Sequence, residues 1–204
     1  RAPGHTRFSL TIHGRKAHAG IEPEKGINAF ATAGRVLSMI RTGRLDRDTV
    51  ANWGLIAGGT AANIIPDLVT LEGEVRSHNP DGRRKFLERV RRCIARADRK
   101  NGTRSVLEII NEYGPFAVPP THPLVRAVEA SCRKAGLPFR CESSGGCSDA
   151  NIIHGKGITC LNLACGMRQV HTVEEHILVQ DLAASARLLL ELVTEGLRGI
   201  PAAG

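Results

Sequence analysis

Polar side chains that could take part in chemistry occur in four short segments of the chain. The first is the glycine-flanked run Gly-Arg-Lys-Ala-His-Ala-Gly at residues 14–20, which places the imidazole of His18 on a loop. An imidazole on a loop can donate a hydrogen bond to an oxyanion that develops during a reaction. Taken alone, His18 has the simpler interpretation of an ordinary exposed histidine.

The second segment is residues 58–67, Gly-Gly-Thr-Ala-Ala-Asn-Ile-Ile-Pro-Asp, which joins two predicted strands. It is too long for a tight hairpin turn. The amide of Asn63 could therefore bind a substrate carbonyl, or it could serve only the local turn.

The third segment is residues 145–151, Gly-Gly-Cys-Ser-Asp-Ala-Asn, which precedes a predicted short helix. Successive backbone N–H groups at such a place, including that of Gly146, can bind an anion such as a substrate carboxylate. Ser148 could instead be only a helix cap. Cys147 has no paired base nearby in the sequence, so we interpret it as a bystander thiol.

The fourth segment is residues 170–175, Val-His-Thr-Val-Glu-Glu, which directly follows a predicted buried strand. Ligands and metals gather at strand ends in α/β sheets. His171 is a zinc ligand by residue type, and a structural histidine is the alternative for His171 taken alone.

Hydrophobic periodicity predicts the elements that position the first two segments. The predicted strands are residues 8–12, 50–57, 68–77 and 105–111. One helix, at about residues 24–41, lies between the first two strands, and another, at 79–101, lies between the last two. This β-α-β-β-α-β order predicts an α+β lid, a four-stranded antiparallel sheet with two helices on one face. Arg76 falls on the polar face of the third strand, together with Glu72 and Glu74, so a surface ion pair with one of these glutamates is one interpretation of Arg76.

The pattern changes after Tyr113, where Pro115, Pro119 and Pro120 are typical of a linker. The following residues alternate between predicted helices and strands, in the order helix 122–135, strand 139–142, helix 149–154, strand 158–164 and helix 179–195. Such alternation favours part of an α/β domain with a parallel sheet. We therefore predict two domains, residues 1–113 and 114–204.

Composition narrows the possible partners and location. The chain has 204 residues, a net charge of +8, and six cysteines with no Cys-x-x-Cys pair, which indicates reduced thiols in a cytoplasmic protein. The basic cluster at residues 83–92 is interpreted as a solvated helix face. An RNA-binding split βαβ sheet is disfavoured because paired aromatic residues for base stacking are missing. We expect neither nucleic-acid nor membrane binding, and the start at Arg1 rather than Met indicates a fragment.

The four segments, read together with Glu-x-Arg-Ser at residues 74–77, resemble a known family. The ordered set Gly-Arg-x-Ala-His-Ala-Gly, Asn-Ile-Ile-Pro-Asp, Glu-x-Arg-Ser, Gly-Gly-x-Ser-Asp-Ala-Asn and His-Thr-x-x-Glu is similar to the dinuclear zinc exopeptidase superfamily. That superfamily includes peptidase T, carboxypeptidase G, aminoacylase and succinyl-diaminopimelate desuccinylase. The Ser-Asp-Ala-Asn and His-Thr variants resemble the peptidase T-like branch.

The resemblance implies a fold and an activity for nearly the whole chain. Residues 5–112 match a lid domain that usually mediates dimerisation, and residues 114–197 match the last part of a zinc-binding α/β catalytic domain. The implied protein is a zinc-dependent aminopeptidase or tripeptidase-like metallopeptidase, a homodimer through its lid, that hydrolyses small peptides. Two zinc ions would activate a bridging water, and a carboxylate base would take its proton.

The resemblance also assigns substrate-binding roles. His18 corresponds to a lid histidine, often of the other subunit, that polarises the scissile carbonyl. Asn63 and Arg76 match lid residues that bind the substrate's carbonyl and carboxylate. Gly146 and Ser148 belong to a loop near the substrate's C-terminal end, where this chain departs from the family by having Cys147 in place of a glycine.

For the metal site the resemblance is incomplete. His171 corresponds to the last zinc ligand, and Glu175 matches a position that would support it. The family's His-x-Asp motif, catalytic glutamate and further acidic ligand have no counterpart, since Gly4-His5-Thr6 is no His-x-Asp. We therefore expect the chain alone to be inactive, and a non-catalytic dimerisation module is the alternative function.

Overall fold

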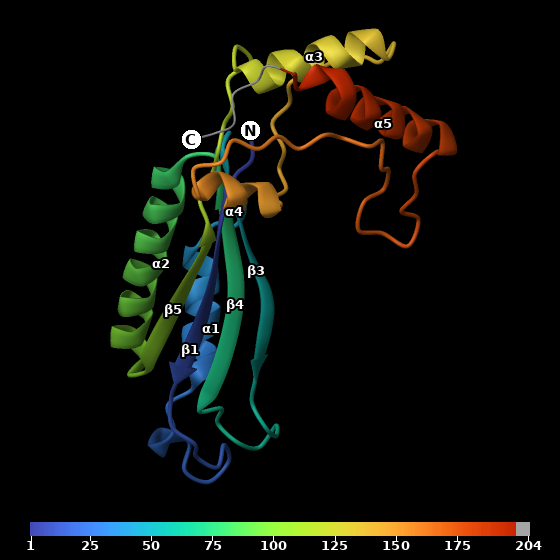
Figure 1. Cartoon of the computed structure of the whole chain (residues 1–204). Coiled ribbons are helices and arrows are strands. Elements are labelled where there is room, and N and C mark those ends of the chain that lie inside the picture. Colours follow the sequence, from blue (N-terminus) through green and yellow to red (C-terminus); the bar gives the residue numbers. More distant parts are fainter. Residues whose placement is uncertain (199–204) are drawn as a thin grey trace. The chain divides into compact units, whose positions relative to one another are not determined.

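The computed structural model describes residues 1–198, which form two compact units (Figure 1). The lid unit consists of residues 2–115 and 145–147. The C-terminal unit consists of Arg1, residues 116–144 and the chain from Ser148 onward. The loop at 145–147 thus belongs with the lid unit, whereas the sequence assigned it to the second domain. Residues 199–204 of that predicted domain lie outside the described residues.

The lid unit contains an antiparallel sheet of five strands in the order β2-β3-β4-β1-β5. The strands are β1 (Gly4–His13), β2 (Gly43–Arg44), β3 (Thr49–Gly58), β4 (Leu68–Ser77) and β5 (Arg104–Tyr113). The predicted α+β lid is confirmed. Strand β2 is an addition to the four predicted strands, because its two residues are too few to show a hydrophobic pattern.

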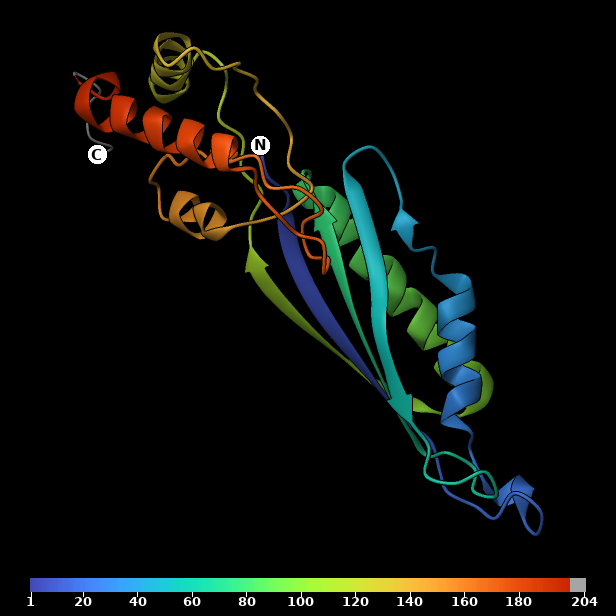
Figure 2. The same ribbon diagram turned by 90° about the vertical axis from the view of Figure 1, so that its right-hand side faces the viewer.

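Helices α1 (Ala29–Met39) and α2 (Pro80–Asn101) cover one face of this sheet (Figure 2). An asparagine begins each helix: the side chain of Asn28 accepts from the backbone of Phe30, and that of Asn79 from Asp81. Such caps satisfy backbone N–H groups that a helix start leaves without partners. The first helix starts later than predicted, because residues 23–25 form the 3-10 helix η1 and Ile27 pairs with Arg15.

The core of the lid unit lies between the sheet and these two helices. Its largest fully buried apolar side chains are Leu10, Ile12, Val36, Val69, Leu71, Val75 and Val90. Burying one such side chain stabilises the fold by about 1.5–3 kcal/mol. Gly73 makes room for the edge-on contact of Phe8 with Trp53, since a Cβ at residue 73 would lie 2.6 Å from the ring of Phe8.

The C-terminal unit is helical where it is regular. It contains α3 (Pro123–Lys134), α4 (Asp149–Gly155) and α5 (Val179–Glu191), which continues into the short π-helix η2 (Leu192–Gly196). Its apolar cluster is small and consists of Val128, Cys132, Leu188 and Leu192, with Leu137, Phe139 and Leu161 packed against it.

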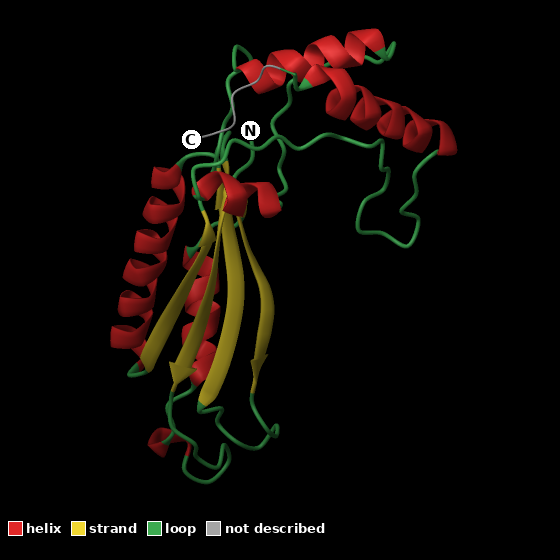
Figure 3. Cartoon of the chain, viewed as in Figure 1, coloured by secondary structure: helices red, strands yellow, loops and turns green. Residues whose placement is uncertain are grey.

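The two strands predicted for this unit, at residues 139–142 and 158–164, are wrong for the described structure (Figure 3). Neither segment lies in a strand or a helix, and Ile158 and Leu163 are 52% and 39% exposed. A parallel strand forms only when a neighbouring strand accepts its backbone hydrogen bonds. Among residues 116–198 no such neighbour is present.

None of the helices in residues 1–198 has the length and apolar composition that a membrane-spanning helix needs.

Candidate functional site

Two loops beyond one end of the lid sheet, residues 14–28 and 59–67, bring His18 and Asn63 together (Figure 1). We call this the distal end, where His13 pairs with Leu68. The loops are joined by backbone hydrogen bonds, from Gly14 to Asp67 (2.7 Å) and from Ala19 to Asn63 (2.9 Å). His18 itself forms a β-bridge with Ile64. Residues 45 positions apart in the sequence are therefore held side by side.

The side chains of His18 and Asn63 are exposed to solvent. The Nδ1 atom of His18 accepts a hydrogen bond from the backbone N–H of Gly20 at 3.2 Å. A neutral imidazole that accepts through Nδ1 carries its proton on Nε2. The distal end therefore presents an imidazole N–H donor beside an amide group, as an oxyanion-binding role requires.

Arg76 lies at the opposite end of the same sheet, which we call the proximal end. There it pairs with His5 of β1, next to the pairing of Gly4 with Ser77. Its Nε and Nη2 atoms each lie 3.0 Å from an oxygen of Glu74. The ion pair with Glu74, one of the two interpretations of Arg76, is thus present. A guanidinium has five N–H donors, so this contact leaves donors for a second carboxylate.

A network of charged groups surrounds the pair of Glu74 and Arg76. The Nε2 atom of His5 lies 2.9 Å from Oε2 of Glu74, the oxygen that also accepts from Nη2 of Arg76. The Nδ1 atom of His5 lies 3.6 Å from Glu112. Glu112 also forms an ion pair with Arg7. Burial alone would raise the pKa of Glu74, but Arg76 and His5 hold that pKa below its ordinary value. The hydrogen bond that Arg76 donates to Glu74 in turn raises the pKa of Arg76, so both groups are charged at neutral pH.

The loop at 145–147 lies at the proximal end as well. The sulfur of Cys147 is 3.4 Å from the carbonyl oxygen of Pro3. Burial, with a hydrogen bond to Cys147, raises the pKa of Tyr113 to about 12. Cys147 also interacts electrostatically with Arg76. The structure therefore brings the exposed Gly146 to the same end of the lid as Arg76.

The two ends of the lid sheet are too far apart to serve one small substrate within one chain. Arg76 is eight residues from Leu68 along β4, which corresponds to roughly 26 Å at a rise of about 3.3 Å per residue. An extended tripeptide spans only about 10 Å. A short peptide held by Arg76 therefore cannot reach His18 and Asn63 of the same lid.

Ser148 begins the described helix α4 of the C-terminal unit. Its hydroxyl accepts from the backbone of Ala150, and the side chain of Asn151 accepts from the backbone of Ser148, which together form a capping box. The hydroxyl is also 2.8 Å from the amide of Asn162. Helix capping, the second interpretation of Ser148, is what this geometry shows.

His171 lies in a tight turn closed by the pairing of Arg168 with His176. Its backbone has a φ of 68°, a left-handed conformation that non-glycine residues seldom adopt. The carboxylate of Glu175 accepts a hydrogen bond from the His171 backbone N–H at 2.5 Å. Glu175 thus stabilises the strained backbone that presents the exposed imidazole of His171.

His171 fits a metal site only as a single ligand. Zinc in catalytic sites takes three protein ligands as a rule. The described residues contain no group of three or more His, Cys, Asp or Glu side chains that could hold a metal ion. The residues present therefore do not by themselves assemble a zinc centre.

The lid unit has an apolar groove that the sequence did not predict. It lies between α1 and β3, has a volume of about 360 Å³, and is lined by Phe30, Ala33, Gly34, Leu37, Ile56, Ala57 and Gly58. Strand β3 pairs with β2 only at Val50 and Ala51, so residues 52–58 form a free sheet edge. The groove ends at Gly58, where the loop that holds Asn63 begins.

Comparison with known proteins agrees with the fold of the lid unit. Residues 2–102 match the model of the M20 peptidase dimerisation domain. The chain thus contains an M20 peptidase dimerisation domain, and the proteins similar to it include peptidases and deacetylases.

Several similar proteins cover nearly the whole chain. The protein YqjE of Bacillus subtilis is 35% identical over 95% of this chain and 52% of its own length. The crystal structure of aminopeptidase PepT from Bacillus cereus is 32% identical, with a TM-score of 0.83 over 97% of this chain and 53% of that one. A tripeptidase structure from Staphylococcus aureus is 30% identical, with a TM-score of 0.89 over 97% and 52%. The chain thus spans about half the length of these relatives.

Proposed function

We propose that this chain is part of a zinc-dependent aminopeptidase or tripeptidase of the peptidase T type that hydrolyses short peptides as a homodimer. The separation of the two ends of the lid sheet is the observation that carries the proposal. Because about 26 Å separates Arg76 from the distal end, a peptide held by Arg76 of one subunit needs His18 and Asn63 of the other.

In this arrangement each residue has one task. Arg76 binds the peptide's carboxylate through guanidinium donors that Glu74 leaves free. His18 of the other subunit donates from Nε2 to the scissile carbonyl oxygen, and Asn63 binds a carbonyl beside it. Preorganised donors of this kind contribute about 3–4 kcal/mol each to transition-state stabilisation.

The remaining predicted residues frame the reaction centre. His171 would contribute one zinc ligand, with its backbone held by Glu175. Gly146 would lie near the peptide's carboxylate, at the proximal end with Arg76. Bound zinc would supply an activated water and polarise the carbonyl.

The groove between α1 and β3 is the surface through which we expect two lids to pair. Leu55 and Ile56 on the free edge are 64% and 59% exposed, and Phe30 is 46% exposed. A free edge with apolar side chains is well suited to pair with a second strand. The distal loops adjoin this edge, so pairing there would carry His18 towards the other subunit.

A substrate panel tests the proposed activity in the complete protein that contains this chain. We expect zinc-dependent hydrolysis of tripeptides with a free amino and a free carboxyl terminus. N-acetylation or C-terminal amidation of the same tripeptide should lower kcat/KM at least about tenfold. A preference for N-acetylated amino acids over tripeptides would instead indicate a deacylase, the activity named for several relatives.

For the chain by itself the better supported function is dimerisation, because the dimerisation-domain model matches residues 2–102. We expect light scattering at micromolar concentration to give twice the chain mass of 21.9 kDa. We also expect only background peptide hydrolysis with added zinc. Zinc-dependent turnover that is lost in His171→Ala would contradict this assignment.

A further inference from the structure

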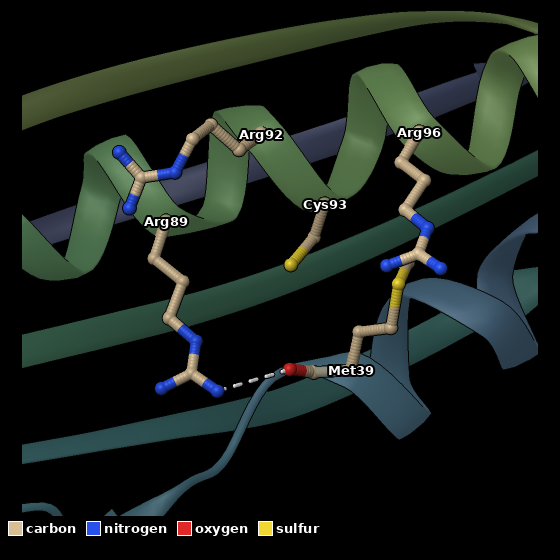
Figure 4. Close-up of a pocket in the computed structure, with 5 residues that line it drawn as sticks. All are labelled: Met39, Arg89, Arg92, Cys93 and Arg96. Carbon is tan, nitrogen blue, oxygen red and sulfur yellow. Dashed lines mark hydrogen bonds between the residues drawn. The ribbon is translucent and has the colours of Figure 1, made fainter.

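A second pocket lies on the helical layer of the lid unit, at the end of α1 (Figure 4). It has a volume of about 290 Å³ and is lined by Met39, Arg89, Arg92, Cys93 and Arg96. Arg89 and Arg96 extend from α2 on either side of Cys93 towards Met39, the last residue of α1. Arg92 extends along α2 on the side of Arg89. The lining thus combines two sulfur-containing side chains, Met39 and Cys93, with three arginines.

The positive charge of this pocket is not neutralised by carboxylates of the two helices. Helix α1 contains no acidic residue. On α2, Asp81 and Glu88 both pair with Arg84, and Asp98 accepts hydrogen bonds from the loop and strand that follow the helix. All three acidic residues of α2 thus interact with residues that do not line the pocket.

The end of α1 balances only a small part of the charge. Arg89 donates to the carbonyl oxygen of Met39 at 3.4 Å. The carbonyl end of a helix carries roughly half a negative elementary charge, which is less than one guanidinium group. Within residues 1–198, Arg92 and Arg96 form no ion pair with an acidic side chain. The guanidinium groups of Arg92 and Arg96 therefore remain available to an anion.

We propose that this pocket binds a phosphate group, on inorganic phosphate or on a small phosphomonoester. Planar guanidinium groups match the oxygens of a phosphate through paired hydrogen bonds. The volume of about 290 Å³ is at the lower limit for small-molecule sites, so the ligand is small. The lining has no aromatic side chain for base stacking, which disfavours single-stranded nucleic acid as the occupant.

The thiol of Cys93 provides a local reporter for this site. It is partly exposed between Arg89 and Arg96, whereas the exposed Cys141 lies outside the pocket. We expect phosphate to slow alkylation of Cys93 by iodoacetamide in a saturable way at constant ionic strength. Alkylation of Cys141, followed by mass spectrometry in the same sample, should not change.

Two double variants, each of which removes two positive charges from α2, distinguish a specific binding site from non-specific electrostatic attraction. Arg92→Gln with Arg96→Gln removes the free guanidinium groups and keeps the hydrogen bond of Arg89 to the carbonyl oxygen of Met39. We expect it to raise the Kd of phosphate at least about tenfold, as the loss of two charge-assisted hydrogen bonds implies. Arg91→Gln with Arg99→Gln, on the same helix outside the lining, should change the Kd less than about twofold. Both variants should melt near the wild-type temperature.

Phenyl phosphate and inorganic phosphate, compared as probes, distinguish the two sources of the phosphate group. Tighter binding of phenyl phosphate assigns the pocket to a phosphomonoester, and equal binding assigns it to the free ion. The proposal is overturned if Cys93 and Cys141 are slowed equally, or if no saturation is seen. It is also overturned if both double variants raise the Kd of phosphate to the same extent. The same holds if both raise the Kd of a single-stranded oligonucleotide, used as a further probe, to the same extent.

Discussion

At the distal end of the lid sheet, His18 and Asn63 are exposed, and their loops are held together by backbone hydrogen bonds. At the proximal end, Arg76 is half-buried and tied to Glu74 within a charged network. The distal end can therefore contact a group that lies outside the lid, whereas the proximal end holds a guanidinium group in a fixed place. Under the proposed function, this difference means that each lid contributes one half-site at each of its two ends.

The distal end should show the largest effect when it is altered in the complete enzyme. His18→Ala removes the Nε2 donor, and we expect kcat/KM for a tripeptide to fall about 100- to 1000-fold. His13→Ala is the matched control, because His13 is exposed at the last position of β1. It should remain within about twofold of wild type. A loss of less than tenfold in His18→Ala would remove this residue from the reaction centre.

The proximal end should be sensitive to geometry as well as to charge. Arg76→Lys keeps the charge but cannot form two parallel hydrogen bonds to a carboxylate. We expect a fall in kcat/KM of about 10- to 100-fold on peptides with a free carboxyl terminus. Amidated peptides should hardly distinguish the variant from wild type. Near-wild-type kinetics on the free acid would leave Arg76 as a surface ion pair with Glu74.

The free edge between the two ends should control dimerisation. Ile56→Glu places a charge in the groove of α1 and β3, where pairing would bury it at a high cost. We expect the dimer Kd, measured by analytical ultracentrifugation, to rise at least about tenfold. Val106→Glu on β5 is the control, since this exposed side chain lies outside the groove. An unchanged dimer in Ile56→Glu would mean that the lids pair elsewhere.

Glu74→Gln should have the smallest effect, because the amide keeps its shape and one acceptor for Arg76. We expect KM to rise about two- to fivefold with little change in kcat. Glu72→Gln, a neighbour on the same strand face, should leave KM unchanged. A drop in kcat of tenfold or more would show that Glu74 does more than orient the guanidinium.

The same variant has a predicted pH signature. The pKa of Glu74 is lowered on folding from 4.5, so its contribution to stability is fully present above pH 4.5. That contribution is lost as the pH falls through the lowered pKa. The difference in melting temperature between wild type and Glu74→Gln should therefore shrink in acid. A difference that grows below pH 4.5 would contradict the direction of this shift.

The lid could be predicted from the sequence because each strand and helix shows its own period. Strand β4 alternates buried and accessible residues, and its strand neighbours follow from the order of the elements. The C-terminal unit was predicted less well. The apolar run at 158–164 has the composition of a buried strand, but composition does not reveal whether a partner strand exists.

For the site, the sequence indicated the residue types but not their places. The pairing of His18 with Asn63 arises from contacts between two irregular loops, which have no hydrophobic period. The ion pair of Arg76 with Glu74 was one of two open interpretations, because side-chain torsions decide it. The left-handed backbone of His171 has no signature in residue type, since glycine usually occupies such positions.

Subunit complementation tests most directly whether the two half-sites meet across a dimer. His18→Ala and Arg76→Ala are each purified as the complete enzyme, unfolded, mixed in equal amounts and refolded together. In a mixed dimer with shared sites, one site carries both substitutions and the other carries neither. Random pairing makes half of the dimers mixed, with one intact site in each.

We therefore expect the mixture to recover about a quarter of the wild-type activity, although each variant alone is nearly inactive. Each variant refolded alone is the control, and mixing without unfolding should give no recovery if subunits do not exchange. If the refolded mixture stays as inactive as its two components, each site uses His18 and Arg76 of the same chain. That result would contradict the shared-site account.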